Sequence, residues 1–385
     1  MANTLTGLIP TIYAALDVVS REMIGFIPNV QRDATAESGA VGQTVTSPVT
    51  PANALEDITP GADPAESGDQ TIGSVDVQIT KSKAYPIRWS GEEQLAVTAN
   101  GTVNTILRDQ FTQGFRTLAN AVEADLAALY VHAARAAGSA GTTPFATADN
   151  HTDFAEANRV LDEAGAPQGD RVMIVGSAAR AKLEGVQSSL FKVNEAGDQG
   201  ALLRDRQMRM LHGFTLGFSA GIKSHTPGTA TGYLVNTGTP YAAGDTEIAV
   251  DTGSGPHLAG DILTFAGDDT QYVVGTDATG TGAKTLSLNG TGLDAALLDG
   301  TEVTTAGAYT ANLFFTRNAM LLAARQPAMP EGGDAADDVM TVTDPLSGLT
   351  FQVAMYRQYR RVKYEIGLAW GAAMVKQEHA GILLG

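Results

Sequence analysis

Residues 102–137 carry the strongest periodic pattern in the sequence. Large apolar residues recur there at spacings of three and four, which is typical of one face of an amphipathic helix. They are Val103, Leu107, Phe111, Phe115, Leu118, Val122, Leu126 and Leu129. With Thr102 as N-cap and Gly138 as the stop, the helix would be about 54 Å long at 1.5 Å per residue. Helices in globular proteins average three or four turns, so this element is too long for one compact layer, and Gly114 in its middle predicts a bend or a close backbone contact.

Residues 32–73 differ in character from the segments around them. They are mainly Thr, Ala, Gly, Pro, Asp and Glu, and their few larger apolar residues are Val41, Val45, Val49, Leu55, Ile58 and Ile72. A loop of this length is uncommon inside a compact domain. Two interpretations stay open: disorder, or an arm whose apolar residues contact another chain. Alternation then predicts a long strand over 75–89, with Val75, Val77, Ile79, Tyr85, Ile87 and Trp89 on one side.

The remaining segments predict an α+β organisation. A helix over 154–164, a buried strand over 171–176 and a helix from Ser177, its expected cap, to Leu183 form one unit. Residues 241–304 contain ten acidic residues and one base, Lys284. Short strands are expected there at 246–250, 261–265, 271–274 and 284–288, which predicts an inserted small β domain. Longer elements follow at 313–324, 339–342, 349–356 and 357–384, with a break at 327–338.

Composition limits the classes of function. A length of 385 residues predicts two or three structural units. Charged residues make up 17% of the chain against a usual figure of about 25%. Such surfaces are easily buried against a neighbour, although a small-residue bias of the genome explains the figure nearly as well. The formal charge of -17 argues against direct nucleic-acid binding, which depends on Lys and Arg.

Three features that would indicate secretion or a membrane location are missing from the sequence. It contains no cysteine, no run of 18 apolar residues and no basic leader at its N-terminus. Disulfides, a membrane-spanning helix and a signal peptide are therefore not expected.

One pattern matches a hydrolase motif. Residues 217–221 read G-x-S-x-G, the nucleophile elbow in which a strand passes into a helix at the serine. Here Pro227 and Gly228 follow closely and leave no helix to hold Ser219. A triad of Ser219, a later Asp and His379 can be composed, but nearly any chain of this size permits one.

Other candidate sites have simpler explanations. Residues 280–285 resemble a phosphate-binding loop, yet Ala283 stands where a glycine must precede Lys284, so a hairpin turn fits better. Asp261, Asp268 and Asp269 have the oxygen ligands that calcium prefers but no fixed ligand spacing. The six His residues show no metal-binding spacing. We expect no catalytic residue, no cofactor and no metal.

Basic residues cluster in two places, and the second cluster is interleaved with tyrosines. The residues are Arg204, Arg206 and Arg209, and then Arg357, Arg360, Arg361 and Lys363. Basic and aromatic residues together suit single-stranded nucleic acid. In so acidic a chain they also suit an acidic neighbouring subunit. We favour contacts between subunits and add Trp89 to this set.

The order of these parts resembles the Hong Kong 97 capsid fold, in the branch of tailed-bacteriophage major capsid (coat) proteins that carry an inserted β-barrel domain. Residues 260–267 (GDILTFAG) are similar to a strand of that insertion domain. Residues 312–317 (NLFFTR) and 324–327 (ARQP) resemble the segment that re-enters the core. The implied parts are an N-terminal arm (1–31), an extended loop and strand (32–89), a peripheral domain with the spine helix (90–149), an axial domain (150–235), the inserted β domain (236–308) and a return to the core (309–385).

This resemblance implies a structural protein and not an enzyme. It would form hexamers and pentamers of an icosahedral head around double-stranded DNA, without sequence-specific DNA contact. The implied partners are further copies, a separate scaffolding protein, a portal protein and, optionally, a decoration protein; no cofactor, membrane or fused scaffold domain is expected. The implied location is the virion, after assembly in the host cytoplasm, and the spine helix would bend or straighten as a procapsid matures. Two other classes stay open: a β-rich surface or secreted binding protein, favoured by the Thr/Gly-rich insert, and the Ser219 hydrolase.

Overall fold

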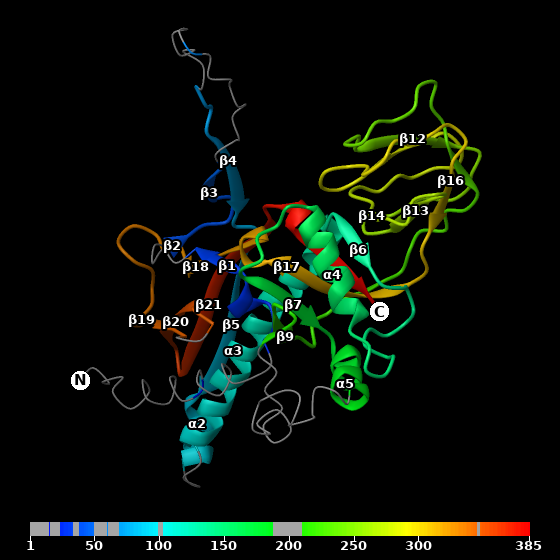
Figure 1. Ribbon diagram of the computed structural model, residues 1–385. Helices are drawn as coiled ribbons and strands as arrows, with labels where there is room; N and C mark the ends of the chain where they lie inside the picture. The colour runs from blue at the N-terminus through cyan, green and yellow to red at the C-terminus, as the bar shows by residue number, and fades with distance from the viewer. Residues whose placement is uncertain are drawn as a thin grey trace.

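The computed structural model describes residues 15, 24–33, 38–49, 60, 69–98, 103–187, 210–344 and 347–385. Two β-sheets with helices packed against them form its main body, and a two-stranded hairpin stands off that body (Figure 1). The predicted α+β class is confirmed. Within these ranges no helix is long and apolar enough to cross a membrane. Most of the N-terminal arm expected over residues 1–31 lies outside the described residues.

The first sheet is organised around one long strand, β21. One edge of β21 pairs with β5 along most of its length, and the other edge pairs first with β20 and then with β18. A single strand therefore joins segments that are far apart in the sequence. The strands of this sheet are β1 (Gln31–Asp33), β2 (Ser38–Gly39), β5 (Lys81–Ser90), β18 (Met320–Pro327), β19 (Asp338–Thr343), β20 (Thr350–Gln358) and β21 (Arg361–Met374).

The predicted long helix is present as α3, Val103–Ala128, and packs on this sheet (Figure 1). Phe111 and Phe115 meet aromatic rings of the sheet at 5.7 and 5.0 Å between ring centroids. A Cβ added at Gly114 would lie 2.6 Å from Cδ1 of Ile366 on β21. The glycine is thus required by close approach of the helix to the sheet, as predicted.

The helix is shorter than predicted. Its end continues as the 3-10 turn η3, Leu129–His132, after which Ala133 is extended. Residues Arg135–Ala137 form strand β6, which is buried between β14 and β22. Sheet pairing therefore overrides the helix propensity of this alanine-rich stretch. At 1.5 Å per residue α3 is about 39 Å long; Gly138 follows a strand, and Thr102 lies outside the described residues.

The second sheet begins with the predicted helix–strand–helix unit. Strand β7 lies beside β17, and helices α4 (Thr152–Glu163) and α5 (Ser177–Val186) flank it in sequence. The unit is confirmed, but the expected Ser177 cap is wrong, because Gly176 holds the N-cap position and no side chain caps this helix. This part of the sheet contains β6, β7 (Arg171–Val175), β8 (Met210–Leu211), β9 (Phe214–Phe218), β10 (Ser224–His225), β17 (Tyr309–Thr316) and β22 (Ala380–Leu384).

The same sheet continues through β6 and β14 into a group of short strands, residues 233–305, called the insert below. Its strands follow the order β15-β12-β11-β16-β13-β14, and a bridge between Val274 and Leu288 brings the two ends of this order together. The insert has a hydrophobic cluster of its own, including Tyr233, Phe265 and Tyr272. The strands are β11 (Tyr233–Val235), β12 (Glu247–Asp251), β13 (Ile262–Phe265), β14 (Gln271–Val273), β15 (Lys284–Ser287) and β16 (Glu302–Thr305).

Several elements differ from the predicted ones. The predicted element over 313–324 is two strands, β17 and β18, separated by the 3-10 turn η5 (Arg317–Ala319). The predicted strand over 75–89 is two strands, β4 (Gly73–Gln78) and β5, although its buried side is as predicted. Helix α2 (Gly91–Thr98) was not predicted. Two further 3-10 turns are η2 (Ile27–Asn29) and η6 (Gln377–His379).

Candidate assembly surface

A groove of about 920 Å³ opens at the tip of the β20–β21 hairpin. It is lined by the end of β5, the start of α2 and the hairpin turn. The turn consists of Tyr359 and Arg360, and Arg360 has a φ of 55°, in the left-handed region that few non-glycine residues adopt. Four of the predicted contact residues meet in this groove: Trp89, Arg357, Arg360 and Arg361.

The aromatic side chains of the groove differ in exposure. Trp89 is 7% exposed, and its Nε1 donates to Oε1 of Gln110 on α3 at 2.7 Å, so it is fixed to the body. Tyr359 is 88% exposed at the tip. The guanidinium of Arg360 lies 5.7 Å from the centroid of the Tyr359 ring. An exposed tyrosine beside an arginine is a combination that is enriched where proteins bind one another.

The basic side chains divide into those with and those without an acidic partner. Arg357 Nε lies 3.3 Å from Oδ2 of Asp337, and Lys363 pairs with Glu365. Within the described ranges Arg360 and Arg361 form no ion pair, and both are exposed. These two guanidiniums are therefore available to an acidic surface.

The loop before β19 contacts the same hairpin. Tyr356 donates its hydroxyl hydrogen to Oδ2 of Asp334 at 2.6 Å. This hydrogen bond to a carboxylate, with burial second, raises the pKa of Tyr356 to about 12. Tyr356 is therefore neutral and keeps its hydrogen bond over the whole physiological pH range.

The start of α2 is the part of the groove that the sequence reasoning missed. Ser90 N donates to Glu93 Oε2 at 2.7 Å, and Glu93 N donates to Ser90 Oγ at 3.3 Å. This reciprocal pair is a capping box, and its S-x-x-E spacing was a readable signal. The hydrogen bonds from Ser90, the backbone one first, lower the pKa of Glu93. Arg204, Arg206 and Arg209 lie outside the described residues, and Lys363 does not line the groove.

A second candidate surface is the hairpin of β3 (Thr44–Val49) and β4. The two strands pair from Thr44–Gln78 to Val49–Gly73 and form a separate sheet (Figure 1). Beside them Val41 is 59% and Ile72 is 64% exposed. The base of this arm is tied to the body, because β1 and β2 pair with β18. An isolated two-stranded hairpin is marginally stable in water, so the arm gains from contact with another surface.

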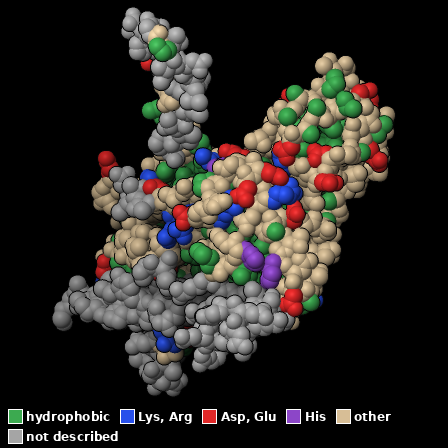
Figure 2. Space-filling model, viewed as in Figure 1, with side chains coloured by type: hydrophobic (Ala, Val, Ile, Leu, Met, Phe, Trp, Pro, Cys, Tyr) green, Lys and Arg blue, Asp and Glu red, His purple; other side chains and the backbone are tan. Residues whose placement is uncertain are grey.

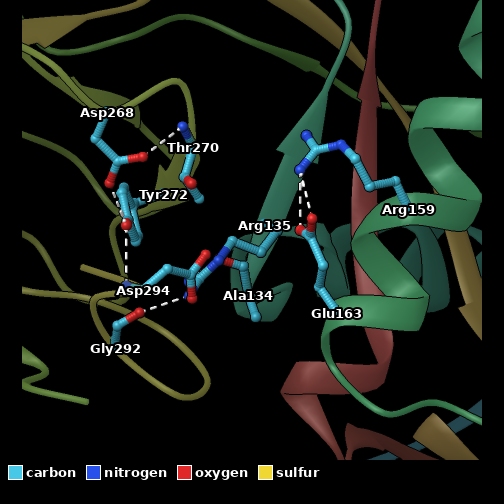
Figure 3. A network of polar contacts seen from close by, with 9 residues as sticks. All are labelled: Ala134, Arg135, Arg159, Glu163, Asp268, Thr270, Tyr272, Gly292 and Asp294. Atoms are coloured by element: carbon cyan, nitrogen blue, oxygen red, sulfur yellow. Dashed lines mark hydrogen bonds and ion pairs between the residues drawn. The ribbon is translucent and has the colours of Figure 1, made fainter. Parts of the chain in front are cut away.

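The insert is fixed to the body by a buried arginine (Figure 3). Arg135 on β6 donates to Gly292 O and to Asp294 Oδ1, each at 2.6 Å, and its guanidinium lies 4.5 Å from the centroid of the Tyr272 ring. Tyr272 in turn donates to Asp268 at 2.6 Å. Burial would raise the pKa of Asp268, but the hydrogen bonds it accepts, from Tyr272 first, lower it overall. The insert therefore sits on the body through a satisfied polar network.

A second polar chain joins the insert to the end of α3. Tyr130 OH is hydrogen-bonded to His225 Nδ1, and His225 Nε2 to Asp261 Oδ1, both at 2.8 Å. Asp261 also accepts hydrogen bonds from Leu258 N and Gly228 N. All its acceptor capacity is thus used within the chain, which favours a structural role over calcium binding. Among the described residues no group of three or more acidic or His side chains could hold a metal.

The geometry around Ser219 does not form a nucleophile elbow. Ser219 follows β9 and is buried, and its Oγ accepts a hydrogen bond from Gly221 N at 3.1 Å. The next regular element is the short strand β10 and not a helix. A cavity of about 230 Å³ beside Ser219 has no His among its lining residues. Lys284, of the predicted turn at 280–285, donates to backbone carbonyls inside the insert.

Several solved structures align with most of this chain, whereas no protein-family model and no curated protein matches it. The capsid of the Cyanophage P-SCSP1u has a TM-score of 0.45 and 11% identity, over 92% of this chain and 86% of that chain. The capsid of a native GTA particle has a TM-score of 0.45 and 9% identity, over 94% and 90%. A structure from Mycobacterium phage Che8 has a TM-score of 0.44 and 13% identity, over 89% and 84%.

Proposed function

We propose that this chain is the major capsid protein of a tailed bacteriophage and acts by assembling with copies of itself. The observation that carries the proposal is the β3–β4 arm, a two-stranded sheet that stands away from the body, with Val41 exposed at its base and Ile72 exposed at its far end. An open hairpin presents unpaired backbone groups and apolar side chains to a second chain. A neighbouring copy is the surface that would cover it.

The second support is the groove at the β20–β21 tip. Its exposed cations, Arg360 and Arg361, suit an acidic partner, and the chain itself carries a net charge of -17. Figure 2 shows acidic side chains over the face of the insert, with Lys and Arg side chains on the body beside it. Opposite charges on different parts of one molecule favour contacts between copies. The groove and the arm are therefore proposed as two inter-subunit contacts.

In this proposal the copies form hexamers and pentamers of an icosahedral head that encloses double-stranded DNA. Residues 32–89 act as the extended loop, α3 as the spine helix, and the insert as a small β-barrel domain. The protein works with a scaffolding protein, a portal protein and, optionally, a decoration protein. It is assembled in the host cytoplasm and resides in the virion.

The test of self-assembly is the mass and appearance of the purified chain. Light scattering and negative-stain electron microscopy are expected to reveal capsomers or closed shells. A chain that stays monomeric at all concentrations would contradict the proposal and favour a β-rich binding protein. Loss of esterase activity in Ser219→Ala would instead support the hydrolase.

The two contacts are tested with matched variants. Ile72→Asp in the arm is expected to abolish assembly, whereas Leu298→Asp, which changes an equally exposed apolar residue of the insert (61% against 64%), leaves it intact. Arg360→Glu is expected to weaken assembly at least tenfold in critical concentration, and Lys182→Glu, the same charge change on α5, to leave it unchanged. Circular dichroism confirms that each variant is folded. Wild-type assembly by Ile72→Asp or Arg360→Glu would refute the corresponding contact.

A further inference from the structure

The core of the insert contains a histidine whose ring has no hydrogen-bond partner among the described residues. His257 is fully buried, and neither Nδ1 nor Nε2 has a partner within the described part of the chain. Buried polar atoms nearly always have one. The backbone of His257 is paired, however: its N donates to Ala278 O at 3.1 Å, and Ala278 N donates to its O at 2.9 Å. The ring therefore lies at a bridge between two loops of the insert.

The surroundings of this ring disfavour its protonated, positively charged form. The imidazole lies 5.0 Å from the Tyr233 ring between centroids, and Lys284 Nζ lies 4.1 Å from the centroid of the same Tyr233 ring. The acidic group that acts on His257 is Asp261, whose oxygens are already used by His225 and by two backbone amides. A protonated His257 would thus share its site with a lysine ammonium and find no free acceptor.

We propose that His257 is an acid-sensitive latch of the insert. The neutral ring is tolerated in the apolar core, and the loops joined at His257 and Ala278 stay closed. When solvent supplies a proton to a ring nitrogen, the imidazolium must be hydrated, and this requires the two loops to separate. This inference concerns the insert alone and does not depend on the capsid proposal.

The direction of the pH dependence follows from linkage. Burial first, and Lys284 second, lower the pKa of His257 to about 4, with Asp261 acting in the opposite direction. In an opened insert the ring returns to its ordinary pKa of about 6.5. Because the closed-state pKa is the lower one, the stabilisation of the closed state is complete above pH 6.5 and is lost as the pH falls toward 4. Linkage therefore predicts that the population of the open insert rises about thirtyfold when the pH is lowered from 7.5 to 5.

The test is amide hydrogen exchange of the full chain at pH 7.5 and 5, followed by mass spectrometry and corrected for the intrinsic pH dependence of exchange. Peptides that cover residues 253–259 and 275–283 are expected to show the thirtyfold rise in opening in the wild type. His257→Phe keeps an aromatic ring but cannot be protonated. Its increase in opening between pH 7.5 and pH 5 should be at least tenfold smaller than that of the wild type. His379→Gln, outside the insert, should behave as the wild type. Other acid-sensitive groups affect all three proteins alike, so the difference isolates His257.

Equal pH dependence in the wild type and His257→Phe would overturn the proposal. Should His257→Phe not fold, the ring of His257 can be titrated directly in the wild-type protein by NMR of labelled histidine. A resonance that stays neutral to below pH 5 and broadens or shifts together with insert opening supports the latch. A reversible titration near pH 6.5 without any opening excludes it.

Discussion

Glu123 on α3 offers a direct test of how the N-terminal segment is held. Its carboxylate is 4% exposed and accepts hydrogen bonds from three consecutive backbone amides: Gly25 N at 2.7 Å, Phe26 N at 2.8 Å and Ile27 N at 3.2 Å. These amides belong to buried residues. Replacing Glu123 with Ala leaves three buried donors without an acceptor.

The expected loss of stability follows from the free energy of leaving a buried donor without an acceptor. Each unsatisfied buried donor costs about 1–3 kcal/mol, so the loss of three acceptors in Glu123→Ala is expected to lower the free energy of unfolding by about 3–9 kcal/mol. Glu123→Gln keeps one acceptor oxygen and should lose about half as much. Glu163→Ala is the matched control, since that exposed carboxylate pairs with Arg159 on the surface of α4 and should cost under about 1 kcal/mol.

Urea unfolding followed by tryptophan fluorescence measures these changes. Trp370 on β21 is a suitable reporter because its Nε1 donates at 2.7 Å to Asp125, which lies on α3 close to Glu123. A loss below about 1 kcal/mol for Glu123→Ala would refute the reasoning, because the three amides would then have found other acceptors. So would equal losses for the Ala and Gln variants.

Two further predictions concern helices. Gly114→Val is expected to destabilise the protein by about 1–3 kcal/mol through overpacking against Ile366. Gly185→Ala, where an added Cβ meets nothing within 4 Å among the described residues, should instead stabilise α5 by about 0.5–1 kcal/mol. Thermal unfolding followed by circular dichroism distinguishes the two signs, and a stabilising Gly114→Val would contradict the close packing. Ser90→Ala removes half of the capping box and should cost about 0.5–2 kcal/mol in the same assay, and a change near zero would mean that the cap does not hold α2.

Two elements differ from the sequence predictions for different physical reasons. The stretch Ala133–Ala137 was predicted to be helical because Gly138 is the expected stop of the long helix, yet Arg135–Ala137 pair with β14 and β22 as strand β6. Helix α2 was missed because its apolar residues are few and Leu95 is 73% exposed, so it has no periodic signal and only its capping box could have identified it. For β6 the deciding contacts come from segments far away in the chain, whereas α2 begins at a local cap between Ser90 and Glu93.

For the candidate contact residues too, the sequence predicted one part of the arrangement and only the structure showed the rest. Clustering in the sequence predicted that Arg357, Arg360 and Arg361 act together, because they flank one hairpin turn. It could not predict that Asp337 already pairs with Arg357 while Arg360 and Arg361 form no ion pair among the described residues. It also could not place Trp89 beside them, since that contact depends on the pairing of Val362 with Trp89 across β21 and β5.

The sequence by itself determined the long helix, the strand alternation after the arm and the acidic strand-rich insert, because periodicity and charge are local properties that each segment carries alone. The tertiary structure alone decided where α3 stops, which cations are left exposed and that the ring of His257 is buried without a hydrogen-bond partner among the described residues. These are outcomes of long-range strand pairing, which brings together residues that no local pattern connects.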